Sequence, residues 1–217
     1  MSKEFNDKLD MRYDVEGVGL IIFDDDQSIF ALSKPKYWTI DKNRTLISYG
    51  CVGGKVEEGE TILEAAKREA YEEISSDIDI ISSKETYLID LDLKVQQVKQ
   101  KFKISPVVLY YFRYPGKPGD PSVKETSFIG KVHVFFAKLK GTPIPSSEVP
   151  AILWTRWDTV QKNIRLYFSL STLLVKGKIK EQIEIPRNSF LYPMWTPEII
   201  GKVFKRNDLK TIFSVHY

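Results

Sequence analysis

A glycine-punctuated loop in this chain runs directly into a helix-forming segment that carries three closely spaced carboxylates. The loop spans residues 53–60, and the segment after it contains Glu69, Glu72 and Glu73. At about 100° per residue, these side chains project from the same side of a helix. Like charges at these spacings repel by a few tenths of a kcal/mol per pair, so a helix that keeps them together usually has a cation to place between them. Clustered carboxylates are hard oxygen ligands that suit Mg²⁺ or Mn²⁺.

The spacing of this loop and helix closely resembles the Nudix box, the signature of hydrolases that cleave a nucleoside diphosphate linked to another group. The pattern is Gly54, five residues, Glu60, seven residues, the run Arg68-Glu69-Ala70, one residue, and then Glu72-Glu73. Defined residues at so many fixed offsets make a far more specific motif than a lone glycine pattern.

The end of the pattern departs from the family. The family has a glycine and then an apolar residue after Ile74, whereas this chain has Ser75 and Ser76. Serine tolerates a left-handed helix cap less readily than glycine. The departure therefore concerns how the helix ends and removes none of the expected ligands.

The resemblance implies a set of metal ligands for Mg²⁺ or Mn²⁺. Carried over by position, the carboxylates of Glu72 and Glu73 and the carbonyl of Gly53 would bind the ion. Glu69 would be a further ligand or the base that takes a proton from the attacking water. Divalent cations neutralise the charge of a diphosphate, orient it and lower the pKa of bound water.

Two further residues of the box have implied supporting roles. Arg68 would hold the glutamates in place through an ion pair, and Glu60 is one candidate for its partner. Many family members add a carboxylate from a later loop. Glu148, six residues before Trp154, is our choice, with Asp120 and Glu125 as competitors and an ordinary exposed glutamate as the alternative interpretation of Glu148.

Aromatic side chains could stack a substrate base, and Tyr37, Trp38 and Trp154 are the candidates. Aromatic residues in strands more often belong to the core, so this alternative stays open for each of them. Cys51 is expected to be a small buried residue. His133 and His216 have no plausible triad partner in the sequence, so nucleophilic catalysis is not supported.

The order of predicted elements favours an α/β (α+β) fold with a Nudix-like mixed sheet sandwiched between helices. Two apolar runs, 18–23 and 28–33, form a predicted hairpin across an acidic turn. The predicted helix runs from residue 60 to about 75 and buries Ile62, Ala66, Ala70 and Ile74. We expect a Nudix domain over residues 1–162, and a mainly helical C-terminal extension over 163–217 that packs on the same domain.

Composition and net charge limit the partners and the cellular location that we expect. A net charge of +3 over 217 residues is too small to argue for a nucleic acid partner, so none is expected, and no stretch is long and apolar enough to span a bilayer. One cysteine and a polar N-terminus without an apolar signal segment favour a cytoplasmic location.

The leading hypothesis is a metal-dependent hydrolase that splits a diphosphate bond in a nucleotide-type small molecule by water attack. One alternative is a catalytically silent Nudix-fold module that binds a partner through Lys202, Lys205 and Arg206. Another is an RNA-cap hydrolase, to which the small net charge gives little support. The substrate does not follow from the motif, and a homodimer is expected by family analogy only.

Overall fold

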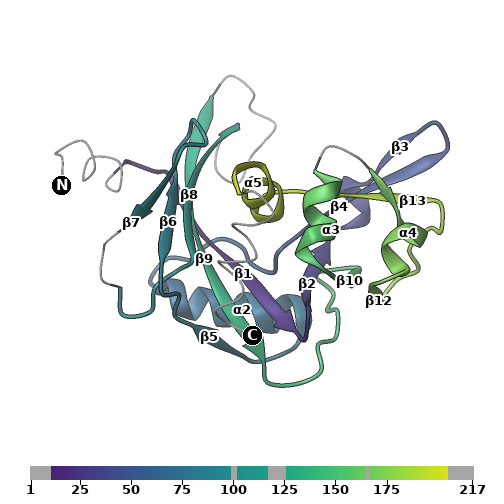
Figure 1. Cartoon of the computed structure of the whole chain (residues 1–217), viewed down its shortest axis with the longest axis horizontal. Helices are drawn as coiled ribbons and strands as arrows, with labels where there is room; N and C mark the ends of the chain where they lie inside the picture. The colour runs from purple at the N-terminus through teal and green to yellow at the C-terminus, as the bar shows by residue number, and fades with distance from the viewer. Residues whose placement is uncertain (1–10, 99–101, 117–125, 165–166, 205–217) are drawn as a thin grey trace. The chain divides into compact units, whose positions relative to one another are not determined.

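The structure is a computed structural model that describes residues 11–98, 102–116, 126–164 and 167–204 (Figure 1). These residues form thirteen strands, four α-helices and one 3₁₀ helix. The strands are β1 Val15–Asp24, β2 Gln27–Leu32, β3 Thr39–Asp41, β4 Arg44–Gly50, β5 Ile78–Ile81, β6 Thr86–Ile89, β7 Val95–Val98, β8 Val108–Pro115, β9 Ser127–Leu139, β10 Ala151–Thr155, β11 Phe168–Ser169, β12 Lys178–Glu181 and β13 Ser189–Pro193. The helices are η1 Pro35–Tyr37, α2 Ile62–Ile74, α3 Trp157–Asn163, α4 Leu170–Leu174 and α5 Thr196–Val203.

The chain divides into two compact units. Unit 1 comprises Met1–Leu20, Gly53–Ala66 and Ile80–Phe136, and unit 2 comprises Ile21–Val52, Lys67–Asp79 and Ala137–Tyr217. Strands β1, β5 and β9 and helix α2 each contribute residues to both units. None of the described helices combines the length and the apolarity needed to cross a membrane.

In unit 1 the strands follow the order β1, β9, β8, β6 and β7. Strands β8 and β9 form a long antiparallel pair that runs from Val108 opposite Val134 to Pro115 opposite Ser127, whereas β6 pairs with β8 in parallel. Alternating apolar residues fill one face of this sheet with a buried cluster. Its members are Leu88, Val98, Leu109 and Tyr111.

In unit 2, strand β4 lies between β2 and β13 and pairs with β13 in parallel. Strand β2 also pairs with β10, and β10 pairs with β12, both antiparallel. Phe30 on β2 packs edge-on against Tyr49 and against Trp157 of α3, with ring centroids 5.4 Å apart in each case. This aromatic core holds α3 on the sheet.

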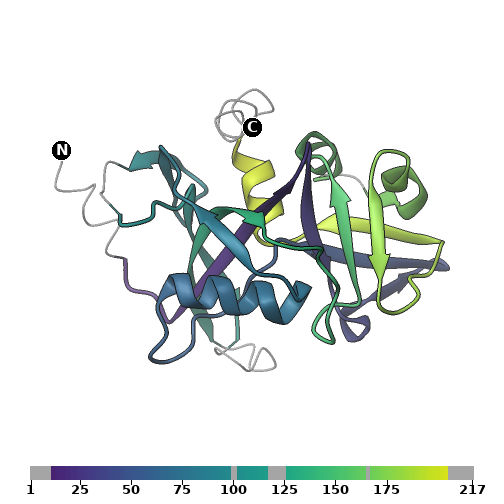
Figure 2. The ribbon, with the colours of Figure 1, turned by 90° about the horizontal axis from the view of Figure 1, so that it is seen from below.

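Several predictions about local structure are confirmed. The hairpin forms between β1 and β2, with Ile22 opposite Ile29 and Asp25 in a left-handed conformation at its turn. Parallel and antiparallel pairs coexist, so the expected mixed sheet of an α+β fold is present. Helix α2 is unbroken (Figure 2) and ends at Ile74.

The predicted buried stripe of α2 is confirmed in three of its four positions. Ala66, Ala70 and Ile74 are fully buried, and Ala65 joins them, whereas Ile62 is only half-buried. Small side chains on this stripe let a helix approach its neighbours closely.

The expectation of a mainly helical segment after residue 163 is wrong for its described part. Besides α4 and α5, this segment contains β11, β12 and β13. Strands β12 and β13 are short, and the sequence of β12 is Lys-Ile-Lys-Glu. Neither strand therefore shows a clear alternation of apolar and polar residues in the sequence. Pairing with β10 and β4 makes them strands. The described residues of this segment belong to unit 2, and the boundary at residue 162 remains a prediction.

Candidate active site

The glycine loop of unit 1 is laid along the first strand. Val18 N–H donates to Gly54 O at 2.8 Å, and Val56 N–H donates to Glu16 O at 2.9 Å. Gly53 has φ +146, and a Cβ built on it would lie 2.1 Å from Val18 O. Both the backbone conformation and the close approach of β1 therefore require glycine at this position.

The loop ends in a turn and a helix cap that fix where α2 begins. Glu60 closes the turn, because its carboxylate accepts from Glu57 N–H at 3.0 Å. Thr61 and Glu64 then form a reciprocal capping box: Glu64 Oε2 accepts from Thr61 N–H at 2.8 Å, and Thr61 Oγ1 accepts from Glu64 N–H at 3.3 Å. The spacing Thr-x-x-Glu is a sequence signal for this cap.

On the part of α2 in unit 2, Arg68 joins two of the three carboxylates. Its Nη1 lies 2.9 Å from Glu69 Oε1 and 2.8 Å from Glu72 Oε2. The Glu69 side chain is 13% exposed and that of Glu72 is 48% exposed. In this structure Arg68 therefore supplies the positive charge that offsets the repulsion between Glu69 and Glu72. Pairing of Arg68 with Glu60 remains a prediction.

The helix ends with the serine that replaces the expected glycine. Ser75 has φ +49, the left-handed conformation of a helix cap, and its N–H donates to Tyr71 O at 2.9 Å. A later loop covers the last two carbonyls of the helix: Ile144 N–H donates to Ile74 O at 2.8 Å, and Ser146 N–H to Glu73 O at 3.1 Å. Serine thus takes the position that the pattern assigns to glycine.

The same loop carries Glu148, which pairs with Lys34. Lys34 Nζ donates to Glu148 Oε2 at 2.5 Å. This hydrogen bond lowers the pKa of Glu148 and raises the pKa of Lys34, to which the charge of Glu73 contributes as well. Lys34 therefore lies within electrostatic reach of both Glu148 and the acidic helix. Asp120 and Glu125, the competing candidates, lie outside the described residues.

Sequence reasoning missed Lys34. Its signal was the run Lys34-Pro-Lys36-Tyr37 between two predicted strands, which combines basic and aromatic residues. Only the folded chain shows that a carboxylate 114 residues away is its partner.

The three aromatic candidates differ in what they can offer a ligand. Tyr37 is 61% exposed and lies under Lys36 Nζ, 4.9 Å from its ring centroid. Trp38 is half-buried, and its Nε1 donates to Ser33 O. Both remain candidates for stacking.

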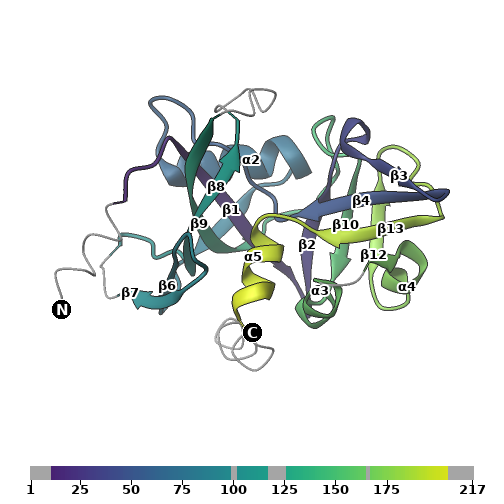
Figure 3. The same ribbon diagram turned by 90° about the horizontal axis from the view of Figure 1, so that it is seen from above.

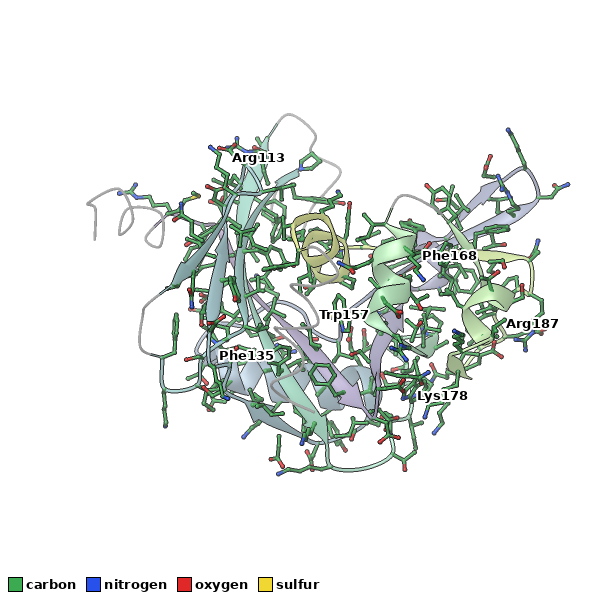
Figure 4. All side chains as sticks on the ribbon, in the orientation of Figure 1. Arg113, Phe135, Trp157, Phe168, Lys178 and Arg187 are labelled. Atoms are coloured by element: carbon green, nitrogen blue, oxygen red, sulfur yellow. The ribbon has the colours of Figure 1, made fainter. Side chains whose placement is uncertain are left out.

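Trp154 does not fit a stacking role. It is 4% exposed, and its Nε1 donates to Asp24 Oδ2 at 2.7 Å. Lys178, labelled in Figure 4, lies over the same ring, with Nζ 4.7 Å from its centroid. Trp154 is therefore a core residue, and Asp24 at the acidic turn is its hydrogen-bond partner.

Neither the described histidine nor the cysteine is placed as a nucleophile would be. The His133 side chain is 7% exposed, and its Nε2 lies 2.8 Å from Glu16 Oε1. This bond lowers the pKa of Glu16 and ties β1 to β9. Loss of hydration inside the protein raises the pKa of the Cys51 thiol, and the charge of Glu73 is a second cause. The thiol therefore stays protonated. His216 lies outside the described residues.

The donor chemistry of α2 fits a divalent cation, although the side chains are not arranged around one. Within the described residues, no three His, Cys, Asp or Glu side chains are grouped closely enough to hold a metal ion. Carboxylates are the ligands that Mg²⁺ and Mn²⁺ prefer, and Arg68 holds two of them. These two must leave Arg68, wholly or in part, before they can share an ion.

Comparison with known proteins identifies the family. Residues 14–173 match the family model of the NUDIX domain. No curated protein matches the chain.

Similar solved structures include a NUDIX-family hydrolase from Clostridium perfringens, with 19% identity over 74% of this chain and 91% of that one and a TM-score of 0.42. An ADP-ribose pyrophosphatase from Streptococcus suis shares 15% identity over 66% of this chain and 75% of its own, with a TM-score of 0.38. A C. elegans Ap4A hydrolase shares 18% identity over 68% and 84%, with a TM-score of 0.41. The match to the family model covers more than half of the chain. The chain therefore belongs to the NUDIX family.

Proposed function

We propose that this protein uses Mg²⁺ or Mn²⁺ to hydrolyse a diphosphate bond in a nucleoside diphosphate linked to another group. The observation that carries the proposal is the placement of Glu69, Glu72 and Glu73 on α2, with Arg68 bonded to the first two. Three carboxylates at these spacings repel one another, even though Arg68 is bonded to two of them. A polyanionic substrate and its cations give them a use.

The proposed ligands are the carboxylates of Glu72 and Glu73 and the carbonyl of Gly53, with Glu69 and Glu148 as further candidates. When bound, the cation supplies charge neutralisation and a more acidic water. Gly53 can present its carbonyl because no Cβ separates it from β1. Lys34 holds Glu148 at the loop that covers the end of α2.

Glu69 is our candidate for the general base. It is the more buried of the two carboxylates bonded to Arg68, and that ion pair fixes its position. A carboxylate that an ion pair holds in one position is pre-organised to accept a proton from a water molecule. Arg68 serves as a positioning residue for it.

The test is a screen of nucleoside triphosphates, nucleotide sugars and dinucleotides with Mg²⁺ and with Mn²⁺, in which chromatography measures the nucleotide products of hydrolysis. The Glu69→Gln variant should lower kcat by about 10²–10⁴-fold and leave cooperative unfolding intact. Glu85→Gln changes an exposed glutamate just before β6, is the matched control and should keep full activity. Near-normal turnover by Glu69→Gln refutes its role as base. Inactivity of the wild type on the whole panel would indicate a binding module instead of an enzyme.

A further inference from the structure

The segment between β2 and η1 carries Lys34, the partner of Glu148. Strands β2 and β4 lie side by side (Figure 3), and Ser33 N–H, just after β2, donates to Ser48 O of β4 at 2.9 Å. The carbonyl of Lys34 accepts from Tyr37 N–H at 2.9 Å, which closes η1. Hydrogen bonds therefore fix the backbone around Lys34, whereas its side chain is 40% exposed.

One residue, Ser146, connects Glu148 to the acidic helix. Ser146 N–H donates to Glu73 O at 3.1 Å, and the Ser146 hydroxyl donates to Glu72 O. The oxygen of the same hydroxyl accepts from Glu148 N–H at 3.0 Å, and Lys34 Nζ lies 2.5 Å from Glu148 Oε2. An unbroken series of hydrogen bonds within unit 2 therefore leads from Lys34 to the two residues that are the first candidates for metal ligands.

The ion pair of Lys34 with Glu148 is more open to water than the pair of Arg68 with Glu69. The side chains of Lys34 and Glu148 are 40% and 53% exposed, whereas those of Arg68 and Glu69 are 23% and 13% exposed. Exposed ion pairs contribute little to stability, because water screens them. Lysine makes its contact through a compact ammonium group on a flexible stem, so it can turn to another anion without a change of the backbone. The Lys34–Glu148 pair can therefore be exchanged at little cost.

Lys34 and a dication would compete for the same carboxylate, that of Glu148. If Glu148 turned to a cation, Lys34 would lose the anion that holds it. The diphosphate of the substrate would bring new negative charge to the same site, and lysine binds phosphate as a point charge. Exchange of one anion for the other would therefore keep the charge of Lys34 balanced throughout.

We propose that Lys34 binds the diphosphate of the substrate by exchanging Glu148 for a phosphate oxygen. Before the exchange Lys34 holds Glu148, and after it Glu148 serves the cation while Lys34 serves the phosphate. The inference rests on the proposed function and deepens it, because it names the residue that binds one part of the same substrate. Lys34 then has effects of opposite sign: it opposes the binding of the cation alone, and it favours the binding of the diphosphate.

Calorimetric titration of the full chain separates these two effects. One titration uses Mn²⁺ alone, and the other uses methylenediphosphonate, a non-hydrolysable diphosphate, at saturating Mg²⁺. Lys34→Ala should bind Mn²⁺ about two- to fivefold more tightly than the wild type, because a competitor for Glu148 is gone. The same variant should bind methylenediphosphonate about ten- to a hundredfold more weakly, because it lacks a hydrogen bond between charged groups.

Three further variants separate this role from a structural one. Lys34→Arg keeps the positive charge and should retain most of the affinity for methylenediphosphonate. Lys202→Ala removes the lysine of another exposed ion pair, the one with Glu198 on α5, and should change neither affinity. In Glu148→Gln, which lacks the carboxylate for which Lys34 competes, the addition of Lys34→Ala should no longer raise the affinity for Mn²⁺.

Unchanged affinity of Lys34→Ala for methylenediphosphonate would overturn the exchange and leave the proposed function standing. A Mn²⁺ affinity of Lys34→Ala that stays equal or falls would also overturn it, because Lys34 would then not compete with the cation. If the wild type bound neither Mn²⁺ nor methylenediphosphonate, the proposed function would fail and the exchange with it.

Discussion

Replacing Gly53 with alanine should destabilise the protein far more than the same replacement at Gly59, although both glycines lie in one loop with positive φ. Gly59 has φ +82, and a Cβ built on it meets nothing within 4 Å. Its replacement therefore costs only the backbone strain of a left-handed residue, about 1 kcal/mol.

At Gly53 three costs combine. The residue has φ +146, and the added Cβ would lie 2.1 Å from Val18 O and 2.9 Å from Gly19 Cα. Those are backbone atoms and cannot rotate away, so the loop must separate from β1. Overpacking costs about 1–3 kcal/mol, and the hydrogen bond from Val18 to Gly54, which lies in the same contact, contributes about 0.5–1.5 kcal/mol. Together with the backbone strain, we expect a loss of about 3–5 kcal/mol.

Urea unfolding measures the difference directly. With a slope of about 1–3 kcal/mol per M, Gly53→Ala should lower the midpoint by well over 1 M, and Gly59→Ala by less than about 1 M. The slope should stay the same, since both variants reach the same unfolded state. Equal midpoints for the two variants would refute the close approach of Val18 to the loop.

Three further predictions concern other positions. Ser75→Gly should raise the free energy of unfolding by about 1 kcal/mol, because glycine adopts the φ of +49 without strain; Ser75→Ala, which keeps the Cβ, should show no such gain. His133→Gln should destabilise the protein at pH 7, and this loss of stability should shrink as the pH falls. The lowered pKa of Glu16 stabilises the fold above its ordinary value of 4.5, and this contribution is lost as pH falls through the folded value; a difference that stays constant while Glu16 titrates contradicts this. Trp195 has φ 57° and ψ −122°, a conformation that normally requires glycine. Trp195→Gly should therefore be more stable than Trp195→Ala by about 1–2 kcal/mol in thermal unfolding, and equal stability would show that the backbone is not strained.

The parts of the site that depend on neighbouring residues could be predicted from the sequence. The loop and α2 follow from glycine positions and a repeat of small apolar residues, both of which act within one or two helical turns. The side of the helix that carries Glu69 and Glu72 follows from helix geometry alone. The capping box of Thr61 and Glu64 has the same local character.

The parts that depend on distant pairing could not be predicted. Strand β13 pairs with β4 across more than 140 residues, from Ser189 to Thr45, and its short sequence has no period that distinguishes it from a loop. Lys34 and Glu148 are 114 residues apart in the sequence, and only the fold brings them into contact. The backbone conformation of Trp195 results from hydrogen bonds on both of its sides, and no residue preference predicts it.

Calorimetric titration with Mn²⁺ tests the central claim, that the carboxylates of α2 bind dications, most directly. The wild type should take up Mn²⁺, and the variant Glu72→Gln with Glu73→Gln should bind it at least about tenfold more weakly, since a charged ligand contributes over 1 kcal/mol. Glu85→Gln should bind it like the wild type. Absence of Mn²⁺ uptake by the wild type, or equal uptake by the double variant, would contradict the account.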